Sequence, residues 1–224
     1  QNNFQFFTEE MHSRISHRLT MESQLRKAIE REEFILHFQP QVKLSNSRIV
    51  GAEALIRWNH PEMGMVAPGQ FIPIAEETGL IIPIGEWVLH SACSEAKRWQ
   101  KALHQPIVAA VNLSARQFRQ TNLLDVIQKT LSFHGMQPSQ LELEITESLV
   151  MHEPEKTTLL LRQMKEMGLH ISLDDFGTGY SSLAYLKNFP VDRLKIDKSF
   201  VQDVAIVRAV IQLARSFNLE TIAE

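Results

Sequence analysis

Short apolar runs alternate with longer helical patterns along this chain of 224 residues. Such alternation is typical of a parallel sheet whose strands are joined by crossover helices. The apolar runs predict seven strands, at Phe34–Gln39, Ile49–Trp58, Ile107–Leu113, Gln140–Glu147, His170–Phe176, Arg193–Phe200 and Leu219–Ala223. Apolar positions recurring every three or four residues predict helices, clearest at Met21–Glu33, Ile84–Gln100, Leu123–His134, Pro154–Met167 and Ala205–Phe217.

The number and order of these elements favour a (β/α)₈ barrel, a fold of about 250 residues. A doubly wound open sheet is the alternative architecture. A barrel that ended after its seventh strand would leave two unpaired sheet edges, so we expect an eighth strand beyond Glu224 in the whole protein. Very few residues join the last predicted strand-helix pair, and we expect a loop to be missing between Asp203 and Ile206.

The composition fits one soluble globular domain: 44% of the residues are hydrophobic, 22% are charged, and the net charge is −3. A single cysteine, Cys93, excludes a disulfide scaffold. No apolar run approaches the roughly 20 residues of a membrane helix. The slightly negative charge gives no reason to expect DNA or RNA as a partner. The first residue is not Met, which indicates a fragment.

Polar side chains interrupt five of the predicted strands, although strands buried on both faces should be almost continuously apolar. Period-two alternation places Glu53, Leu55 and Arg57 on one face of the second strand. The polar residues of the other four strands are Asn112, Glu142 with Glu144, Asp174 with Asp175, and Lys195 with Asp197. In a barrel these side chains would converge at the C-terminal mouth, where barrel active sites lie.

Carboxylate and amide oxygens without a thiolate suit Mg²⁺ or Mn²⁺, and a nearby lysine and arginine suit a phosphate. The residues therefore favour a metal-dependent phosphoryl or phosphodiester enzyme. Each acid taken alone could instead be a helix cap, a loop contact or a solvated group. Other motifs are weak: Gly177–Ser182 lacks the third glycine of a dinucleotide fingerprint. Cys93 lies in an amphipathic helix and is expected to be a core residue rather than a nucleophile.

Several longer motifs occur in order along almost the whole chain. They are Phe38–Pro40, Glu53–Arg57, Phe71–Gly79, Val111–Ser114, Glu144–Glu147, Asp174–Leu183, Leu194–Val201 and Ile222–Glu224. In these motifs the sequence resembles the EAL-domain family of cyclic-di-GMP phosphodiesterases. The resemblance implies a modified TIM-like barrel with an antiparallel first strand. It also implies hydrolysis of cyclic-di-GMP to linear 5′-pGpG, with two Mg²⁺ or Mn²⁺ ions. We expect Ca²⁺ to inhibit, because its looser coordination would misplace water and phosphate.

The resemblance also implies the role of each site residue. The implied metal ligands are Glu53, Asn112, Glu144, Asp174 and Asp175, with Asp174 bridging the two ions. Lys195 would hold the attacking water and Glu224 would support this part of the site, so that both are catalytic together with Glu53. Arg57 would bind phosphate, and Gln39 and Leu55 would touch the nucleotide. Glu147 would anchor the loop Phe176–Ser182, which couples the metal site to dimerisation in the family.

The start of the chain, Phe6–Met11, resembles the connector after a GGDEF domain. We therefore expect residues 1–20 to be that connector, and residues 21–224 to be an EAL domain truncated at its end. The expected setting is bacterial second-messenger and biofilm signalling, with GGDEF or other regulatory domains upstream. We expect a homodimer and a cytoplasmic location, in a parent protein that could be anchored in a membrane. The alternatives are an inactive cyclic-di-GMP receptor and a protein-interaction domain that ignores the nucleotide.

Overall fold

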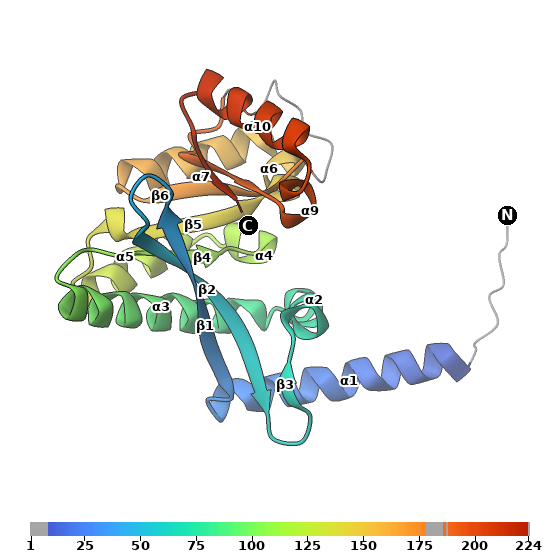
Figure 1. Cartoon of the computed structure of the whole chain (residues 1–224). Coiled ribbons are helices and arrows are strands. Elements are labelled where there is room, and N and C mark those ends of the chain that lie inside the picture. The colour runs from blue at the N-terminus through green and yellow to red at the C-terminus, as the bar shows by residue number, and fades with distance from the viewer. Residues whose placement is uncertain (1–8, 178–185, 187, 224) are drawn as a thin grey trace, which may run out of the picture.

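A curled sheet forms a half-barrel, and helices surround its outer side (Figure 1). The computed structural model describes residues 9–177, 186 and 188–223, with side chains from Arg18 onward except that of residue 152. The strands are β1 (Phe34–Lys43), β2 (Arg48–His60), β3 (Gly64–Val66), β4 (Val108–Asn112), β5 (Leu141–Thr146), β6 (His170–Phe176), β7 (Arg193–Ile196) and β8 (Glu220–Ala223). Their order is β1-β2-β4-β5-β6-β7-β8, with β3 paired to β2.

The first strand runs opposite to its neighbour, as predicted from the resemblance. β1 pairs with β2 in antiparallel register, and all the pairs from β2–β4 to β7–β8 are parallel. The C-terminal ends of β2 and β4–β8 therefore meet at one edge of the half-barrel. β1 and β8 lie at the two ends of the strand order. The doubly wound alternative is wrong, because such a sheet carries helices on both faces.

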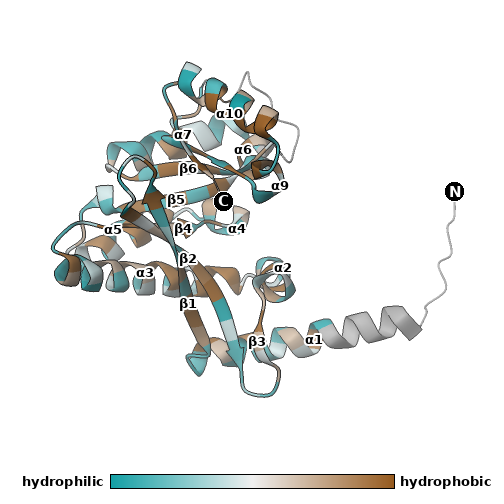
Figure 2. Ribbon diagram, in the orientation of Figure 1, coloured by the Kyte–Doolittle hydropathy of each residue, from teal (hydrophilic) through white to brown (hydrophobic). Residues whose placement is uncertain are grey.

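The helices are α1 (Glu9–Glu30), α2 (Pro68–Thr78), α3 (Ile81–Leu103), α4 (Ala115–Phe118), α5 (Leu123–His134), α6 (Glu147–His152), α7 (Pro154–Glu166), α9 (Lys198–Val201) and α10 (Val204–Ser216), with a 3₁₀ turn η1 (Pro138–Gln140). Hydrophobic and hydrophilic residues alternate along α3 and α10 (Figure 2). On α3 the buried positions include Ile81, Ile84, Val88 and Leu89, which share one helical stripe. This stripe packs against β4 and β2, and α10 packs likewise against β7 and β8.

Four helices, α2, α4, α6 and α9, were absent from the sequence prediction. α2 contains Pro68 and Pro73, which obscured its pattern, although Pro68 at the first turn and Gly79 at φ +84° mark its two ends. α4 and α6 have only four and six residues, too few to show a period.

Several predicted boundaries were wrong, and two of them lie at β7 and α1. The predicted strand Arg193–Phe200 ends at Ile196, because the Asp197 side chain accepts a hydrogen bond from the Ser199 backbone N–H and begins α9. The helix predicted at Met21–Glu33 begins at Glu9 and ends at Glu30, so it runs without a break through the expected connector boundary at residue 20. That boundary stays a prediction.

The segment from Asp203 to Ile206 is continuous: Asp203 caps α10 through its side chain, which accepts from the backbone N–H groups of Ala205 and Ile206. The suggested missing loop stays a prediction about the parent protein. Among the described residues, no helix is both long enough and apolar enough to cross a membrane.

Candidate active site

Five neighbouring strands bring polar side chains together at the C-terminal edge of the half-barrel. These side chains belong to Glu53 on β2, Asn112 on β4, Glu144 on β5, Asp174 on β6 and Lys195 on β7. Parallel register places Asn112 beside Glu144, and it places Glu53 beside Ala110, two residues before Asn112 on β4. Residues up to 142 positions apart in the sequence are thereby in contact. We call these five residues the upper cluster.

The Lys195 ammonium lies at the centre of the upper cluster. Its Nζ is 2.7 Å from Glu144 Oε2, 3.1 Å from Glu53 Oε2 and 3.2 Å from Asp174 Oδ2. The Lys195 side chain is only 1% exposed and that of Glu144 is fully buried. Three carboxylates thus surround one ammonium, which leaves a surplus of negative charge within the barrel.

Hydrogen bonds also hold the second carboxylate oxygens of Glu53 and Asp174. Asn112 Nδ2 donates to Glu53 Oε1 over 2.8 Å, and the Asp175 backbone N–H donates to Asp174 Oδ1 over 2.9 Å. The pairing of β6 with β7 is irregular between Leu173 and Phe176, and Asp175 has φ +54°. A bulge of this kind redirects side chains, so two successive carboxylates can serve one site.

Burial and like charges perturb the titration of this cluster. The pKa of Glu144 is raised to about 9: burial raises it most, Lys195 opposes the shift, and the neighbouring Glu53 and Asp174 add to it. Burial alone would lower the pKa of Lys195, but the carboxylates of Glu144, Asp174 and Glu53 raise it above its usual value. Lys195 is therefore an ammonium at neutral pH. Partial burial and the charge of Asp174 raise the pKa of Asp175.

The donor set of the upper cluster fits a hard divalent cation by its chemistry. It consists of carboxylates and one amide, and Glu144 Oε1 is buried with no hydrogen-bond partner among the described residues. Within residues 9–177, 186 and 188–223, no three acidic, histidine or cysteine side chains already surround an ion-sized position. The Lys195 ammonium instead fills the space between three of the acids.

Gln39, Leu55 and Arg57, predicted to contact the nucleotide, lie next to this cluster. Gln39 on β1 is the register partner of Glu53 and is exposed. Leu55 and Arg57 follow Glu53 at every second position of β2, and both are half-buried. Arg57 Nη1 donates to the backbone carbonyl of Ile56 over 2.8 Å, which holds the guanidinium near the strand. These residues continue the polar face of β2 beyond Glu53.

Glu147 begins α6 directly after β5 and is 3% exposed. Its Oε2 accepts a hydrogen bond from the Gly177 backbone N–H over 3.4 Å, at the start of the loop that it was predicted to anchor. Gly177 has φ +95°, a conformation that favours glycine. Residues 178–182 of that loop, and Glu224, lie outside the described residues.

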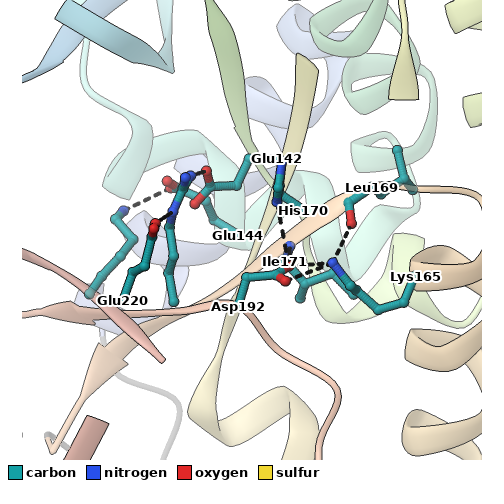
Figure 3. A network of polar contacts seen from close by, with 10 residues as sticks. Glu142, Glu144, Lys165, Leu169, His170, Ile171, Asp192 and Glu220 are labelled. Atoms are coloured by element: carbon teal, nitrogen blue, oxygen red, sulfur yellow. Dashed lines mark hydrogen bonds and ion pairs between the residues drawn. The ribbon is translucent and has the colours of Figure 1, made fainter. Parts of the chain in front are cut away.

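A second buried ion pair lies two residues further down the same strands, and the sequence did not reveal it. Arg193 on β7 contacts Glu142 on β5 through Nη1, and its Nε donates to Glu220 Oε2 over 2.8 Å. Figure 3 shows Glu142, Glu144 and Glu220 on one side, and a separate group around Asp192 on the other. We call Glu142, Arg193 and Glu220 the lower cluster. The period-two pairs Glu142/Glu144 and Arg193/Lys195 were the signal that could have found it.

Two other features are distant from this chemistry. Cys93 is buried in α3, and burial raises the pKa of its thiol to about 12, which confirms a core residue and excludes a thiolate nucleophile. An open cavity of about 630 Å³ lies between β1 and α3, lined by Ile35, Leu36, Phe38, Trp87 and Trp99 together with the polar Ser91, Ser94, Glu95 and Arg98. No residue of the upper cluster lines it.

Comparison with known proteins agrees with this geometry. The model of the EAL domain family matches residues 22–224. The chain is 45% identical, over all of its length, to the bifunctional diguanylate cyclase/cyclic di-GMP phosphodiesterase MucR of Pseudomonas aeruginosa. It is 38% identical, again over its full length, to the cyclic di-GMP phosphodiesterase NbdA of the same organism. The chain spans 34% of the length of the first relative and 30% of the second.

Solved structures show the same fold. A structure described as the PaMucR phosphodiesterase in complex with c-di-GMP superposes with a TM-score of 0.87 at 46% identity, over 91% of this chain and 85% of that one. The EAL enzyme Bd1971, bound to cAMP and cyclic-di-GMP, gives a TM-score of 0.88 at 34% identity, over 93% of this chain and 59% of that one. The family match, the half-barrel and the cluster at its mouth agree, and the chain belongs to the EAL domain family.

Proposed function

We propose that this chain hydrolyses cyclic-di-GMP to linear 5′-pGpG with the help of Mg²⁺ or Mn²⁺. The observation that carries the proposal is the upper cluster, in which three carboxylates converge on one buried lysine at the mouth of the barrel. A cluster with surplus negative charge is costly in a folded protein unless cations bind there. The family match and the two relatives named as cyclic di-GMP phosphodiesterases support the substrate.

The residues proposed to hold the cations are Glu53, Asn112, Glu144, Asp174 and Asp175. When bound, two such cations lower the pKa of a water molecule and polarise the phosphate. Asn112 contributes an oxygen without a further negative charge, once its amide turns from Glu53. The bulge at Asp175 lets Asp174 and Asp175 act together.

Lys195 is proposed to hold the attacking water and to offset the charge that develops on the phosphate. Because its pKa is raised, it is a permanent donor at neutral pH and cannot act as a free base. Its fixed position among three carboxylates orients the ammonium before substrate arrives. Glu224, by resemblance, would support this part of the site.

Substrate binding is proposed for the residues around the upper cluster. The Arg57 guanidinium has five N–H donors, and one of them donates to the backbone carbonyl of Ile56. The other N–H groups can donate to a phosphate oxygen. Gln39 and Leu55 lie beside Glu53 and Arg57, where they would contact the nucleotide. Glu147 is proposed to anchor the loop that follows Gly177 and to couple it to dimerisation.

The cellular setting is also proposed by resemblance. The chain would be the C-terminal EAL domain of a longer bacterial signalling protein, with residues 1–20 as connector and a GGDEF or other regulatory domain upstream. It would act as a homodimer in the cytoplasm, and its parent could be membrane-anchored. Lowering cyclic-di-GMP would then regulate traits such as biofilm formation.

Incubation with cyclic-di-GMP and Mg²⁺ or Mn²⁺, followed by chromatography of the products, tests the proposal. We expect 5′-pGpG with either ion, none with a chelator, and inhibition by Ca²⁺. Binding without product would indicate a receptor, and neither binding nor product would indicate an interaction domain. Full turnover with Ca²⁺ as the only divalent ion would contradict the roles proposed for the metal ligands.

A further inference from the structure

Two histidines face each other across the outer helices α3 and α5, which pack side by side (Figure 1). His90 lies in the middle of α3, and His134 is the last residue of α5. His90 Nδ1 is 3.3 Å from His134 Nε2. None of the residues assigned to the phosphodiesterase site lies on either helix.

A third residue determines which ring nitrogen of His90 carries the proton. The Thr130 hydroxyl donates to the Val126 carbonyl over 2.9 Å, so it is available only as an acceptor to His90 Nε2, 3.2 Å away. His90 Nε2 therefore carries the hydrogen, and the Nδ1 lone pair accepts a hydrogen bond from His134 Nε2–H in the metal-free chain. A bound ion would take the place of that hydrogen, which His134 would release or carry on Nδ1. Hydrogen bonding by the second ring nitrogen is the arrangement that prepares a histidine to ligate a metal.

The separation of the two nitrogens also suits one ion. Ligand nitrogens about 2.0–2.1 Å from a tetrahedral Zn²⁺ are about 3.3 Å apart, which follows from the tetrahedral angle. Burial and the neighbouring His90 lower the pKa of His134. His90 is exposed and His134 half-buried, which leaves room for water ligands.

The surrounding contacts hold the two helices at this spacing. Lys97, two turns after His90, donates from Nζ to the Gly135 carbonyl over 3.0 Å, directly after His134. The Phe133 ring packs against both imidazoles, with ring centroids 5.7 Å from His90 and 4.9 Å from His134. Thr130 is 1% exposed and cannot easily move away from His90.

We propose that His90 Nδ1 and His134 Nε2 bind one imidazole-preferring divalent transition metal, such as Zn²⁺, with water as the remaining ligands. This site differs in chemistry from the oxygen-rich upper cluster, because hard ions such as Mg²⁺ favour carboxylates over imidazole. The bound ion would link α3 to α5, and it would stabilise the native state because the unfolded chain does not hold the two rings together.

Zn²⁺ titration by calorimetry tests this proposal, with the parent chain compared with His90→Ala, His134→Ala and the control His37→Ala. His37 is an exposed histidine on β1. Since Zn²⁺ could also enter the upper cluster, the measured quantity is the difference in stoichiometry. We expect His90→Ala and His134→Ala each to bind one Zn²⁺ fewer than the parent, and His37→Ala to bind as many as the parent.

Thr130→Val tests the role of the tautomer. It should weaken the histidine site about 10-fold, as expected for loss of an outer hydrogen bond, and circular dichroism would confirm that each variant is folded. Zn²⁺ should also raise the unfolding temperature of the parent more than that of His90→Ala. Equal stoichiometry and affinity in the parent and the two histidine variants would overturn the proposal.

Discussion

The upper and lower clusters share strands β5 and β7 but differ in the charge balance of their buried groups. On β5, Glu144 belongs to the upper cluster and Glu142, two residues earlier, to the lower one; Lys195 and Arg193 are related in the same way on β7. In the lower cluster one buried carboxylate meets one guanidinium, and Arg193 reaches outward to Glu220, whose side chain is 73% exposed. In the upper cluster three carboxylates share one ammonium.

The difference separates a structural ion pair from a site for cations. In a balanced buried pair each charge is compensated by its partner, so the pair needs no further ion. Its main effect is to fix the position of β5 relative to β7. A surplus of buried carboxylates is unfavourable until positive charge arrives. We therefore expect changes in the upper cluster to affect turnover and changes in the lower cluster to affect stability.

Glu53→Ala should give the largest effect, a loss of activity of about 1,000-fold or more. The variant loses a proposed charged metal ligand, and Asn112, its hydrogen-bond partner, cannot replace that charge. It should still fold, because Lys195 keeps Glu144 and Asp174 as partners. Product formation at matched Mg²⁺, with folding checked by circular dichroism, measures the effect. Parental activity would contradict the assignment of Glu53.

Lys195→Met should reduce turnover by about 100-fold or more while nucleotide binding changes little, because a charge-stabilising donor near the reacting phosphate is lost. The variant also leaves three carboxylates without their ammonium. Mg²⁺ should consequently raise its unfolding temperature more than that of the parent. Titration of cyclic-di-GMP and product measurement on one preparation separate the roles: strong turnover rejects the catalytic role, and lost binding indicates that Lys195 holds substrate.

Arg193→Met should destabilise the chain by about 3–5 kcal/mol, since it leaves the fully buried Glu142 without its partner. The matched double variant Glu142→Leu/Arg193→Met should recover most of that loss, because no uncompensated charge remains. Denaturant unfolding measures both free energies. If the double variant is as unstable as Arg193→Met, the stabilising effect of the lower cluster does not come from compensating the charge of Glu142.

Lys165→Met should have the smallest effect, about 1 kcal/mol or less. Lys165 Nζ contacts both carboxylate oxygens of Asp192 at 2.7 Å, but both side chains are more than a quarter exposed (Figure 3). Asp192 also keeps the Ile171 backbone N–H as a donor. Denaturant unfolding again measures the free energy. A loss of about 3 kcal/mol or more would show that the Lys165–Asp192 pair stabilises the chain as much as the buried Glu142–Arg193 pair.

The fold was largely predictable because each strand and its following helix carry a local signal. β6 and α5 match the predicted ranges, and the apolar runs identified the other strands of the sheet order. The end of β7 was not predictable from hydrophobicity, since Phe200 continues the apolar pattern while the cap at Asp197 begins a helix. Local hydrogen bonding by a side chain decided that boundary.

The site was predictable in its residues but not in its contacts. Carboxylates at strand ends stand out against an apolar strand, so Glu144 and Asp174 could be identified. The central position of Lys195 depends on three contacts across the barrel, which no local pattern encodes. The contact of Arg193 is equally non-local, because its partner Glu142 is 51 residues away. In the sequence alone Glu142 cannot be distinguished from an acid of the active site.

The upper cluster, and not the lower one, is proposed to perform metal-dependent hydrolysis. The most direct test compares the isosteric variants Glu144→Gln and Glu142→Gln for Mg²⁺-dependent hydrolysis of cyclic-di-GMP per folded molecule. Glu144→Gln should lose about 100-fold or more of the activity, and saturation should require more Mg²⁺. Glu142→Gln should stay within a few-fold of the parent in both respects. Equal losses in the two variants, or a larger loss in Glu142→Gln, would contradict the assignment of hydrolysis to the upper cluster.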